Sequence, residues 1–280
     1  LSLATRKRSS RILKRKRRKT SSPAVSADRY GSLTKNSTNW EDNQMETKAH
    51  TVKRFDAELE ELNNNVVKMA SAVEEQLGRL GDALVNLNAD EAAKVMAEDH
   101  VINSWEAELD DYLETIISRR QPQAVDLRLL LGYYRMTTDF ERMGDEIRNA
   151  AKGVRKLSEL VKPLSEPALA NVSTLFSLHA LLRVMGDDMI ACVRLLDPER
   201  ARALVARRTI VSAEVDEALS DTVERLKTGE LKLADGLEFI RINRSLERVA
   251  AHMQNVGETV VFMTEGVDIR HAGKTQPQQN

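Results

Sequence analysis

The chain repeats one of its own segments. Residues 139–151 read DFERMGDEIRNAA, and residues 245–257, 106 positions later, read SLERVAAHMQNVG in the same frame. An internal repeat restricts the fold to two copies of one structural unit that pack together. The second copy lacks the acidic centre of the first, because Ala251 stands where the first copy has Asp145. Metal chemistry that needs this carboxylate is therefore expected in the first copy alone.

The composition favours an all-helical protein. Of the 280 residues, 41% are hydrophobic and 30% are charged, but only 4% are aromatic. The few glycines and prolines separate long stretches of Glu, Lys, Arg, Leu, Ala and Met, which favour helices. The single cysteine, Cys192, lies in the apolar run MIACVRLL and is expected to be a buried small hydrophobic residue rather than a reactive thiol.

Apolar residues at steps of three and four predict six long helices. Their expected ranges are about 52–87, 91–121, 125–160, 168–196, 198–228 and 233–265. Short connections make neighbouring helices antiparallel. The predicted fold class is therefore all-α, with two tandem three-helix bundles formed by residues 45–162 and 163–270 and packed along their length.

The near-zero net charge divides into two unequal parts. Residues 1–44 carry 12 Lys and Arg against 3 Asp and Glu, and the remaining residues carry 30 against 40, a net charge of −10. Residues 1–44 and 271–280 are predicted to be disordered tails, since they lack a core-facing pattern. The helical pattern begins only after Met45, so the basic tail is interpreted as a non-native extension or, alternatively, as an arm for nucleic acid or anionic lipid. Direct DNA binding by the acidic body is not expected.

The sequence indicates a cytoplasmic protein without catalytic residues. No apolar stretch approaches the roughly 18–20 residues that span a bilayer, and no hydrophobic segment follows the basic N-terminus. The five histidines are scattered, and neither an HExxH motif nor a glycine-rich phosphate loop is present. No enzyme activity is therefore predicted.

Glu141 and Asp145 form an acidic pair on the third predicted helix. Being four residues apart, they stack one turn above the other and face away from the apolar stripe. Like charges at this spacing repel mildly unless solvent screens them or a cation lies between them, and hard metal ions prefer such oxygen ligands. Because Arg142 and Arg148 are close in sequence, the same pattern also fits a solvated, salt-bridged face.

Both copies of the repeat resemble the signature helices of the PhoU family, the phosphate-transport regulatory proteins of bacteria. The segments are DFERMGDEIRNAAKGV and SLERVAAHMQNVGETVVFMTEGVDIRHAG, and SRRQPQAVDLRLLL is similar to the family's link into the third helix. The resemblance implies a non-enzymatic, cytoplasmic negative regulator of phosphate uptake and phosphate-starvation signalling. Such a protein acts as an adaptor between the ATPase of a phosphate ABC transporter and a sensor histidine kinase. It also suggests a homodimer that reaches the membrane only through its partners.

The resemblance further implies a metal site, because family members bind metal clusters through ExxxD pairs on two helices of each repeat. In the first repeat the matching positions are Asp99, Asn103, Glu141 and Asp145. In the second repeat Glu247 remains, but Arg208 and Ser212 occupy the other pair. An arginine brings a fixed positive charge to the place of the cation, so divalent or iron-type metal is expected at the first repeat only. A metal-cluster-binding helical protein without a phosphate-regulatory role remains the alternative.

Overall fold

The computed structural model describes residues 40–160 and 166–270, with side chains described from Lys53 onward apart from Asn86. These residues form helices and no strand, which confirms the predicted all-α fold class. The elements in chain order are α1 (Trp40–Leu84), the 3-10 turn η1 (Val85–Leu87), α2 (Ala89–Ala97), α3 (Asp99–Arg120), α4 (Val125–Leu160), α5 (Glu166–Leu195), α6 (Pro198–Thr228) and α7 (Leu233–Glu265). The described residues from Lys48 onward belong to one compact unit, and the earlier ones belong to another.

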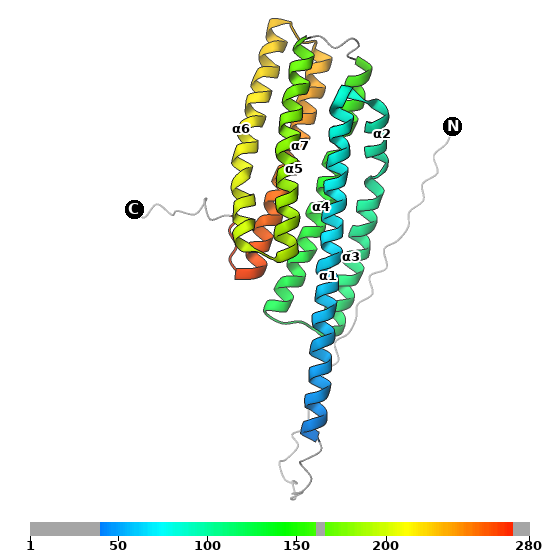
Figure 1. Ribbon diagram of the computed structural model, residues 1–280, viewed down its shortest axis with the longest axis vertical. Helices are drawn as coiled ribbons and strands as arrows, with labels where there is room; N and C mark the ends of the chain where they lie inside the picture. Colours follow the sequence, from blue (N-terminus) through cyan, green and yellow to red (C-terminus); the bar gives the residue numbers. More distant parts are fainter. Residues whose placement is uncertain (1–39, 161–165, 271–280) are drawn as a thin grey trace, which may run out of the picture. The chain divides into compact units, whose positions relative to one another are not determined.

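The two helices that carry the sequence repeat, α4 and α7, are the central helices of this unit. α4 packs against α2, α3 and α7, and α7 packs against α4, α5 and α6 (Figure 1). Gly132 and Gly153 of α4 face α7, where an added Cβ would collide with Met263 and Ile242 respectively. The missing side chains let the two helices approach closely. The repeated segments therefore also join the two halves of the unit.

The apolar stripes that predicted the helices form the core. The largest fully buried side chains are Phe140, Phe239, Leu62, Met69, Leu77, Leu80, Leu84, Ile102, Ile116, Leu130, Met136 and Met143. Each such side chain stabilises the fold by roughly 1.5–3 kcal/mol relative to an exposed one. Cys192 is buried as expected, and burial raises the pKa of its thiol to about 12. A thiol with this pKa is protonated at neutral pH and therefore a poor nucleophile.

Helix ends follow the residues that marked them in the sequence. The Asp197 side chain accepts hydrogen bonds from the backbone N–H groups of Glu199 and Arg200, at 3.0 and 3.2 Å, and so caps α6. Gly229 and Gly266 follow α6 and α7 with φ of 77° and 75°, the left-handed conformation that glycine adopts without strain. These ends confirm the corresponding predicted boundaries.

The second predicted helix is wrong as a single element, because it is divided into α2 and α3 at Glu98. No glycine or proline marks the division. Glu98 instead forms an ion pair with Arg79 of α1, while the next residue, Asp99, turns inward to Arg148 of α4. Two neighbouring acidic side chains thus bind arginines on two different helices. The apolar pattern of the sequence continues across Glu98 and gives no information about such long-range contacts.

Parts of the predicted organisation lie outside the described residues. These parts are residues 1–39 and 271–280 of the two tails, together with the boundary between the bundles at residues 162 and 163. α1 begins at Trp40 rather than near Val52, so residues 40–44, which were assigned to the disordered tail, are helical. The sequence there, WEDNQ, contains no apolar stripe, and the periodicity therefore gave no signal.

α5 is more apolar than the sequence reading allowed. Among the described helices it alone has the length and composition to cross a membrane, with a mean hydropathy of 1.3 over its most apolar stretch. The expectation that no such stretch exists is wrong for this helix. In the folded chain 39% of that stretch is buried, and α5 packs against α6 and α7. A core helix of a bundle meets the same criterion, so this observation is weak evidence for a membrane span.

Candidate functional site

Asp99 lies at the first residue of α3 and is only 6% exposed. Its Oδ2 lies 3.3 Å from Nη1 of Arg148 on α4. Its Oδ1 is buried and has no hydrogen-bond partner among the described residues. Burial raises the pKa of Asp99, and the nearby Asp145 carboxylate adds to the rise, although Arg148 opposes it. Asp99 is thus a buried acid whose charge is only partly compensated.

Arg148 also contacts the acidic pair of α4. Its Nη2 lies 3.2 Å from Oδ1 of Asp145, so one guanidinium bridges carboxylates on two helices. Burial raises the pKa of Glu141, and the carboxylates of Asp145 and Asp99 raise it further. The structure therefore brings Asp99, Glu141 and Asp145 close enough to affect one another.

Asn103, the fourth predicted ligand, differs from these three residues in its surroundings. Its side chain is exposed, and no hydrogen bond among the described residues joins it to the other three predicted ligands. At about 100° per residue, Asn103 lies about 40° around α3 from Asp99, whereas Glu106 lies only about 20° away on the other side. Asn103 and Glu106 therefore lie on the same side of α3 as Asp99, with Asn103 about one turn and Glu106 about two turns further along the helix.

Two acidic residues of α3 were missed by the sequence reading. Burial raises the pKa of Glu106, and Glu141 and Asp110 raise it further. Burial also raises the pKa of Asp110, with a contribution from Asp111. Both lie on the Asp99 face at helical spacings of seven and eleven, so extending the period would have found them. We refer to Asp99, Glu106, Asp110, Glu141 and Asp145 as the acidic seam.

The acidic seam has the ligand atoms that a hard cation prefers, but these atoms are not arranged to hold one. Carboxylate oxygens are the ligands that hard divalent ions prefer, and two of these oxygens, Oδ1 of Asp99 and Oδ1 of Asp110, are buried without a hydrogen-bond partner among the described residues. In the described part of the chain, however, no three or more His, Cys, Asp or Glu side chains are arranged to hold a metal ion. The Arg148 guanidinium lies between the Asp99 and Asp145 carboxylates, and a metal ion there would have to displace it.

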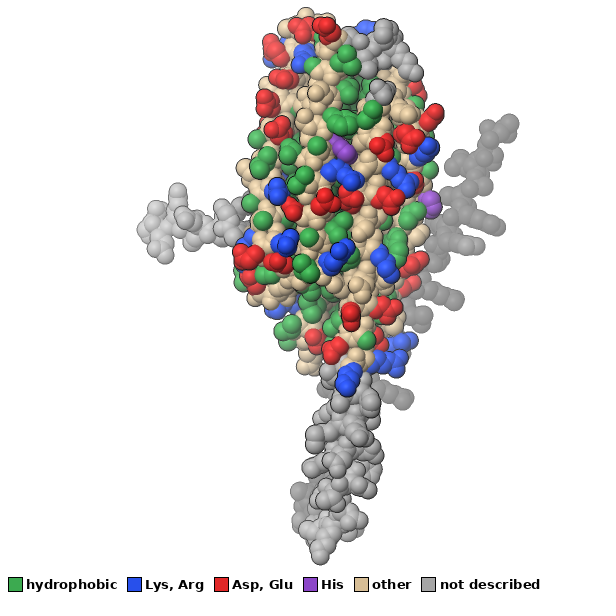
Figure 2. All heavy atoms as spheres, viewed as in Figure 1, with side chains coloured by type: hydrophobic (Ala, Val, Ile, Leu, Met, Phe, Trp, Pro, Cys, Tyr) green, Lys and Arg blue, Asp and Glu red, His purple; other side chains and the backbone are tan. Residues whose placement is uncertain are grey.

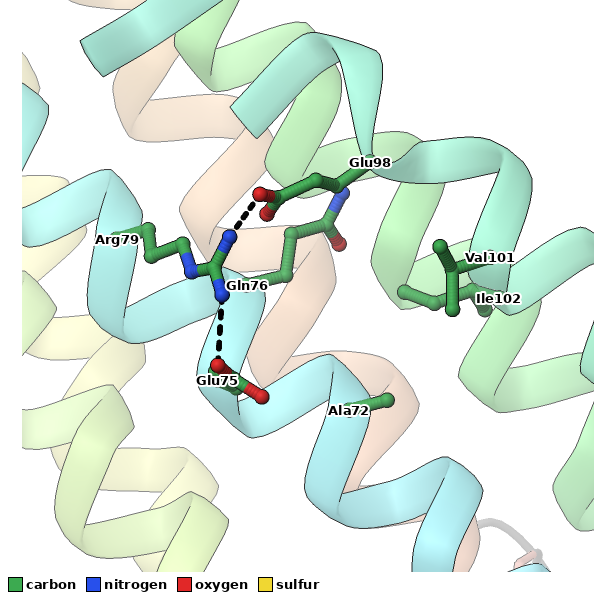
Figure 3. A pocket seen from close by; sticks show the side chains of 7 residues that line it. All are labelled: Ala72, Glu75, Gln76, Arg79, Glu98, Val101 and Ile102. Carbon is green, nitrogen blue, oxygen red and sulfur yellow. Dashed lines mark hydrogen bonds and ion pairs between the residues drawn. The ribbon is translucent and has the colours of Figure 1, made fainter. Parts of the chain in front are cut away.

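A small pocket lies beside the seam at the division between α2 and α3. Figure 3 shows Arg79 of α1 between Glu75 and Glu98, and it forms an ion pair with each of them. Its Nη2 lies 2.7 Å from Oε1 of Glu75. The pocket has a volume of about 200 Å³. Gln76 is buried in its wall, and its Nε2 donates a 3.4 Å hydrogen bond to the Val95 carbonyl. Its charged groups pair with one another, while Oε1 of Gln76 is buried without a hydrogen-bond partner among the described residues. The ion pairs of Arg79 give the pocket a structural role at the division.

The second repeat presents the opposite arrangement. Glu247 of α7 lies 3.1 Å from Nη2 of Arg208 on α6 and 2.7 Å from Nη1 of Arg244. Arg208 also donates a hydrogen bond to Ser212, and Ala251 contributes no carboxylate. Burial alone would raise the pKa of Glu247, but the hydrogen bonds from Arg244 and Arg208 lower it below its ordinary value. Two guanidinium groups therefore surround one carboxylate at the matching position.

His252, which follows the missing carboxylate, contacts the first repeat. Its Nδ1 lies 2.8 Å from Oδ1 of Asp139 on α4, and Asn255 Nδ2 donates a 3.0 Å hydrogen bond to the same oxygen. On the same two helices Arg248 pairs with Glu146 at 2.8 Å. These contacts place His252 in the polar interface between the repeats.

Both repeats match one protein family. The model of the PhoU domain matches residues 66–154 and 175–260, more than half of the chain. The chain belongs to the PhoU family. It is 30% identical over 224 residues to the phosphate-specific transport system accessory protein PhoU homolog of Pseudomonas putida, a match that covers 80% of this chain and 86% of the relative. A homolog of the same description from Burkholderia sp is 28% identical over 227 residues, covering 81% of this chain and 95% of that protein.

Solved structures agree with the PhoU assignment. The crystal structure of PhoU from Pseudomonas aeruginosa gives a TM-score of 0.71 at 27% identity, covering 76% of this chain and all (100%) of that one. The phosphate transport system regulatory protein PhoU from Streptococcus pneumoniae has the same fold, with a TM-score of 0.70 at 23% identity and coverage of 77% and 99%. The first PhoU match includes the whole acidic seam, and the second includes Arg208 and Glu247. The difference between the two faces therefore lies inside the family domain itself.

Proposed function

We propose that this PhoU-family chain is a non-enzymatic, cytoplasmic regulator that restrains phosphate uptake and phosphate-starvation signalling. It acts as an adaptor between the ATPase of a phosphate ABC transporter and a sensor histidine kinase. The observation that carries the proposal is the PhoU match over both repeats, together with relatives named as phosphate-specific transport system accessory proteins. The chain is proposed to act as a homodimer that reaches the membrane through these partners.

The surface of the described part supports a role in binding proteins. Figure 2 shows acidic and basic side chains mixed over one face, with apolar side chains between them. Large apolar side chains of α5 are among those exposed, with Leu169, Phe176 and Val184 each between 41% and 49% exposed. They recur at steps of seven and eight residues and so lie along one side of α5. An exposed apolar helix face is a common site of contact between proteins.

Regulation through protein contacts also fits the charge of the body. Residues 45–280 carry 30 Lys and Arg against 40 Asp and Glu, so the phosphate backbone of DNA would be repelled by the body as a whole. The adaptor role therefore does not call for direct DNA binding.

The proposal is tested in the source bacterium with a strain that lacks this chain. Alkaline phosphatase made in high phosphate is the readout, because loss of a negative regulator leaves the starvation response on. Pull-downs with the complementing wild-type chain should recover the transporter ATPase or the sensor kinase. Normal phosphate regulation in the deletion strain, with neither partner recovered, would contradict the adaptor role.

A metal-binding role at the acidic seam is the second candidate, favoured by the buried Oδ1 of Asp99 that lacks a partner. In this proposal Asp99, Glu141 and Asp145 hold a divalent or iron-type ion after Arg148 moves away, with Asn103 joining through its carbonyl oxygen. Elemental analysis should then find metal in the wild-type chain and none in Asp145→Ala. Complementation separates the two roles, since Asp145→Ala restores repression if the adaptor role is independent of metal and fails if metal is required.

A further inference from the structure

A second pocket lies along the interface between α4 and α7. It has a volume of about 470 Å³, within the range that holds small organic ligands. Arg135, Asp139 and Arg142 of α4 line one side, Asn255 and Thr259 of α7 line the other, and Arg270 follows beyond the end of α7. Three arginines thus converge on one pocket in a body whose net charge is negative.

Two of these arginines are not engaged by carboxylates. Arg135 stacks on the Phe262 ring at 4.9 Å, which holds its guanidinium in place, and Arg142 is exposed. Among the described residues neither forms an ion pair, although Arg142 is close enough to moderate the raised pKa of Glu141. A guanidinium whose donors lack acceptors favours an incoming anion.

The other two charged residues of the lining, Asp139 and Arg270, already have partners. The Asp139 carboxylate accepts a 3.0 Å hydrogen bond from Asn255 and contacts His252, while Arg270 pairs with Asp268. Asp268 compensates the charge of Arg270. Arg135 and Arg142 therefore remain against the single carboxylate of Asp139, which leaves the lining positively charged. The buried Thr259 adds a hydroxyl group beside them.

The internal repeat supplies the comparison that isolates this feature. Arg135 and Arg142 recur 106 positions later as Arg241 and Arg248. Arg241 pairs with Glu238 at 3.1 Å, and Arg248 pairs with Glu146 at 2.8 Å. The same two positions therefore form structural ion pairs in the second repeat. In the first repeat they line a pocket and pair with no carboxylate of the described residues.

We propose that the pocket between α4 and α7 binds a phosphate group, either free or esterified to a small organic molecule. The planar forks of Arg135 and Arg142 match the geometry of tetrahedral oxyanions and bind them through paired hydrogen bonds. The pocket is larger than one phosphate ion, so an ester with a small organic group also fits. Binding to this pocket can be measured independently of the adaptor role, because the measurement needs only the purified chain.

Titration calorimetry of the full chain tests the proposal with inorganic phosphate, adenosine monophosphate and sulfate as probes. Saturable binding of one or both phosphate probes is expected, and tighter binding of the nucleotide would identify an ester as the preferred ligand. Arg142→Gln should weaken that binding at least about tenfold, as expected for lost charged hydrogen bonds. The repeat-equivalent Arg248→Gln should leave the affinity unchanged.

Arg135→Gln provides a second variant, and thermal unfolding of each variant verifies that the chain is folded. The proposal is overturned if neither phosphate probe binds the wild-type chain, if sulfate binds as tightly as phosphate, or if Arg142→Gln and Arg135→Gln both bind like wild type. A negative result here leaves the deletion-strain test of the adaptor role untouched. Failure of the adaptor test would likewise leave binding by the purified chain unchanged.

Discussion

The faces around Glu141 and Glu247 occupy equivalent positions of the repeat but differ in electrostatic character. Around Glu141, burial and neighbouring carboxylates raise the pKa values of Asp99, Glu106 and Glu141. Among the described residues, Arg148 is the one arginine that pairs with acids of this face. Around Glu247, Arg208 and Arg244 lower the pKa of the single carboxylate. The first face therefore holds acids in excess of arginines, and the second holds arginines in excess of acids.

This difference shows how a repeat can keep its fold while changing its chemistry. The apolar positions on α4 and α7 are buried in both copies, and both helices remain central. The exposed and half-buried positions carry no such constraint, so replacing an aspartate with Ala251 and placing Arg208 opposite Glu247 changes the charge alone. The account predicts that substitutions at equivalent positions have different effects in the two repeats.

The largest effect is expected from Arg148→Met, which removes the cation between two carboxylates. Asp99 would be left buried without a partner, and unfolding free energy should fall by about 2 kcal/mol at neutral pH. This is below the usual loss for a fully buried pair, because the Arg148 side chain is 35% exposed. Urea unfolding measures the change. Arg142→Met is the matched control and should stay within about 0.5 kcal/mol of wild type; equal losses would show that Arg148 is not special.

The pH dependence of stability should separate the two faces, with differences of about 1 kcal/mol. The folded pKa of Glu141 is raised, so the native state binds more protons between the unfolded and folded pKa values, and stability falls as pH rises through that window. The folded pKa of Glu247 is lowered, so its stabilisation is present above the unfolded pKa and is lost as pH falls through the folded one. Urea unfolding from about pH 3 to pH 7 should therefore show the effect of Glu141→Gln growing with pH as a gain and that of Glu247→Gln growing as a loss. Effects that do not vary with pH would contradict these pKa directions.

A smaller effect is expected from restoring the missing carboxylate with Ala251→Asp. Ala251 is half-buried and lies one turn from Glu247, so the new carboxylate would add a second negative charge there. The guanidinium of Arg208, which pairs with Glu247, is close enough to offset it. The free energy of unfolding, measured by thermal unfolding, should change by no more than about 0.5 kcal/mol. A loss several times larger would mean that the arginines of the second repeat do not supply a compensating field.

The sequence predicted the all-α fold and most of the helices, but only part of the site. Apolar periodicity and the caps at Asp197 and Gly229 are local signals, and they predicted most helix boundaries. The division at Glu98 depends on an ion pair with Arg79, which lies 19 residues earlier on another helix. No local pattern contains that contact, so the prediction ran two helices together.

The candidate site shows the same limit. The spacing of four between Glu141 and Asp145 puts them on one face of α4, and a helical step of seven from Asp99 along α3 would have added Glu106. The position of Arg148 between Asp99 and Asp145 could not be read from spacing, because it depends on how α3 and α4 pack. Whether an arginine serves as a solvated neighbour or as the bridging cation is thus decided by tertiary structure.

The most direct test of the difference between the repeats is to measure Glu141→Gln and Glu247→Gln together. Both substitutions remove one charge at equivalent positions of the repeat while nearly preserving side-chain shape. Urea unfolding at neutral pH and without added metal should show that Glu141→Gln stabilises the chain, since an acid with a raised pKa loses an unfavourable charge. Glu247→Gln should destabilise it, since two guanidinium groups lose their partner. Changes of the same sign in both variants would contradict the claim that one repeated frame carries two opposite electrostatic faces.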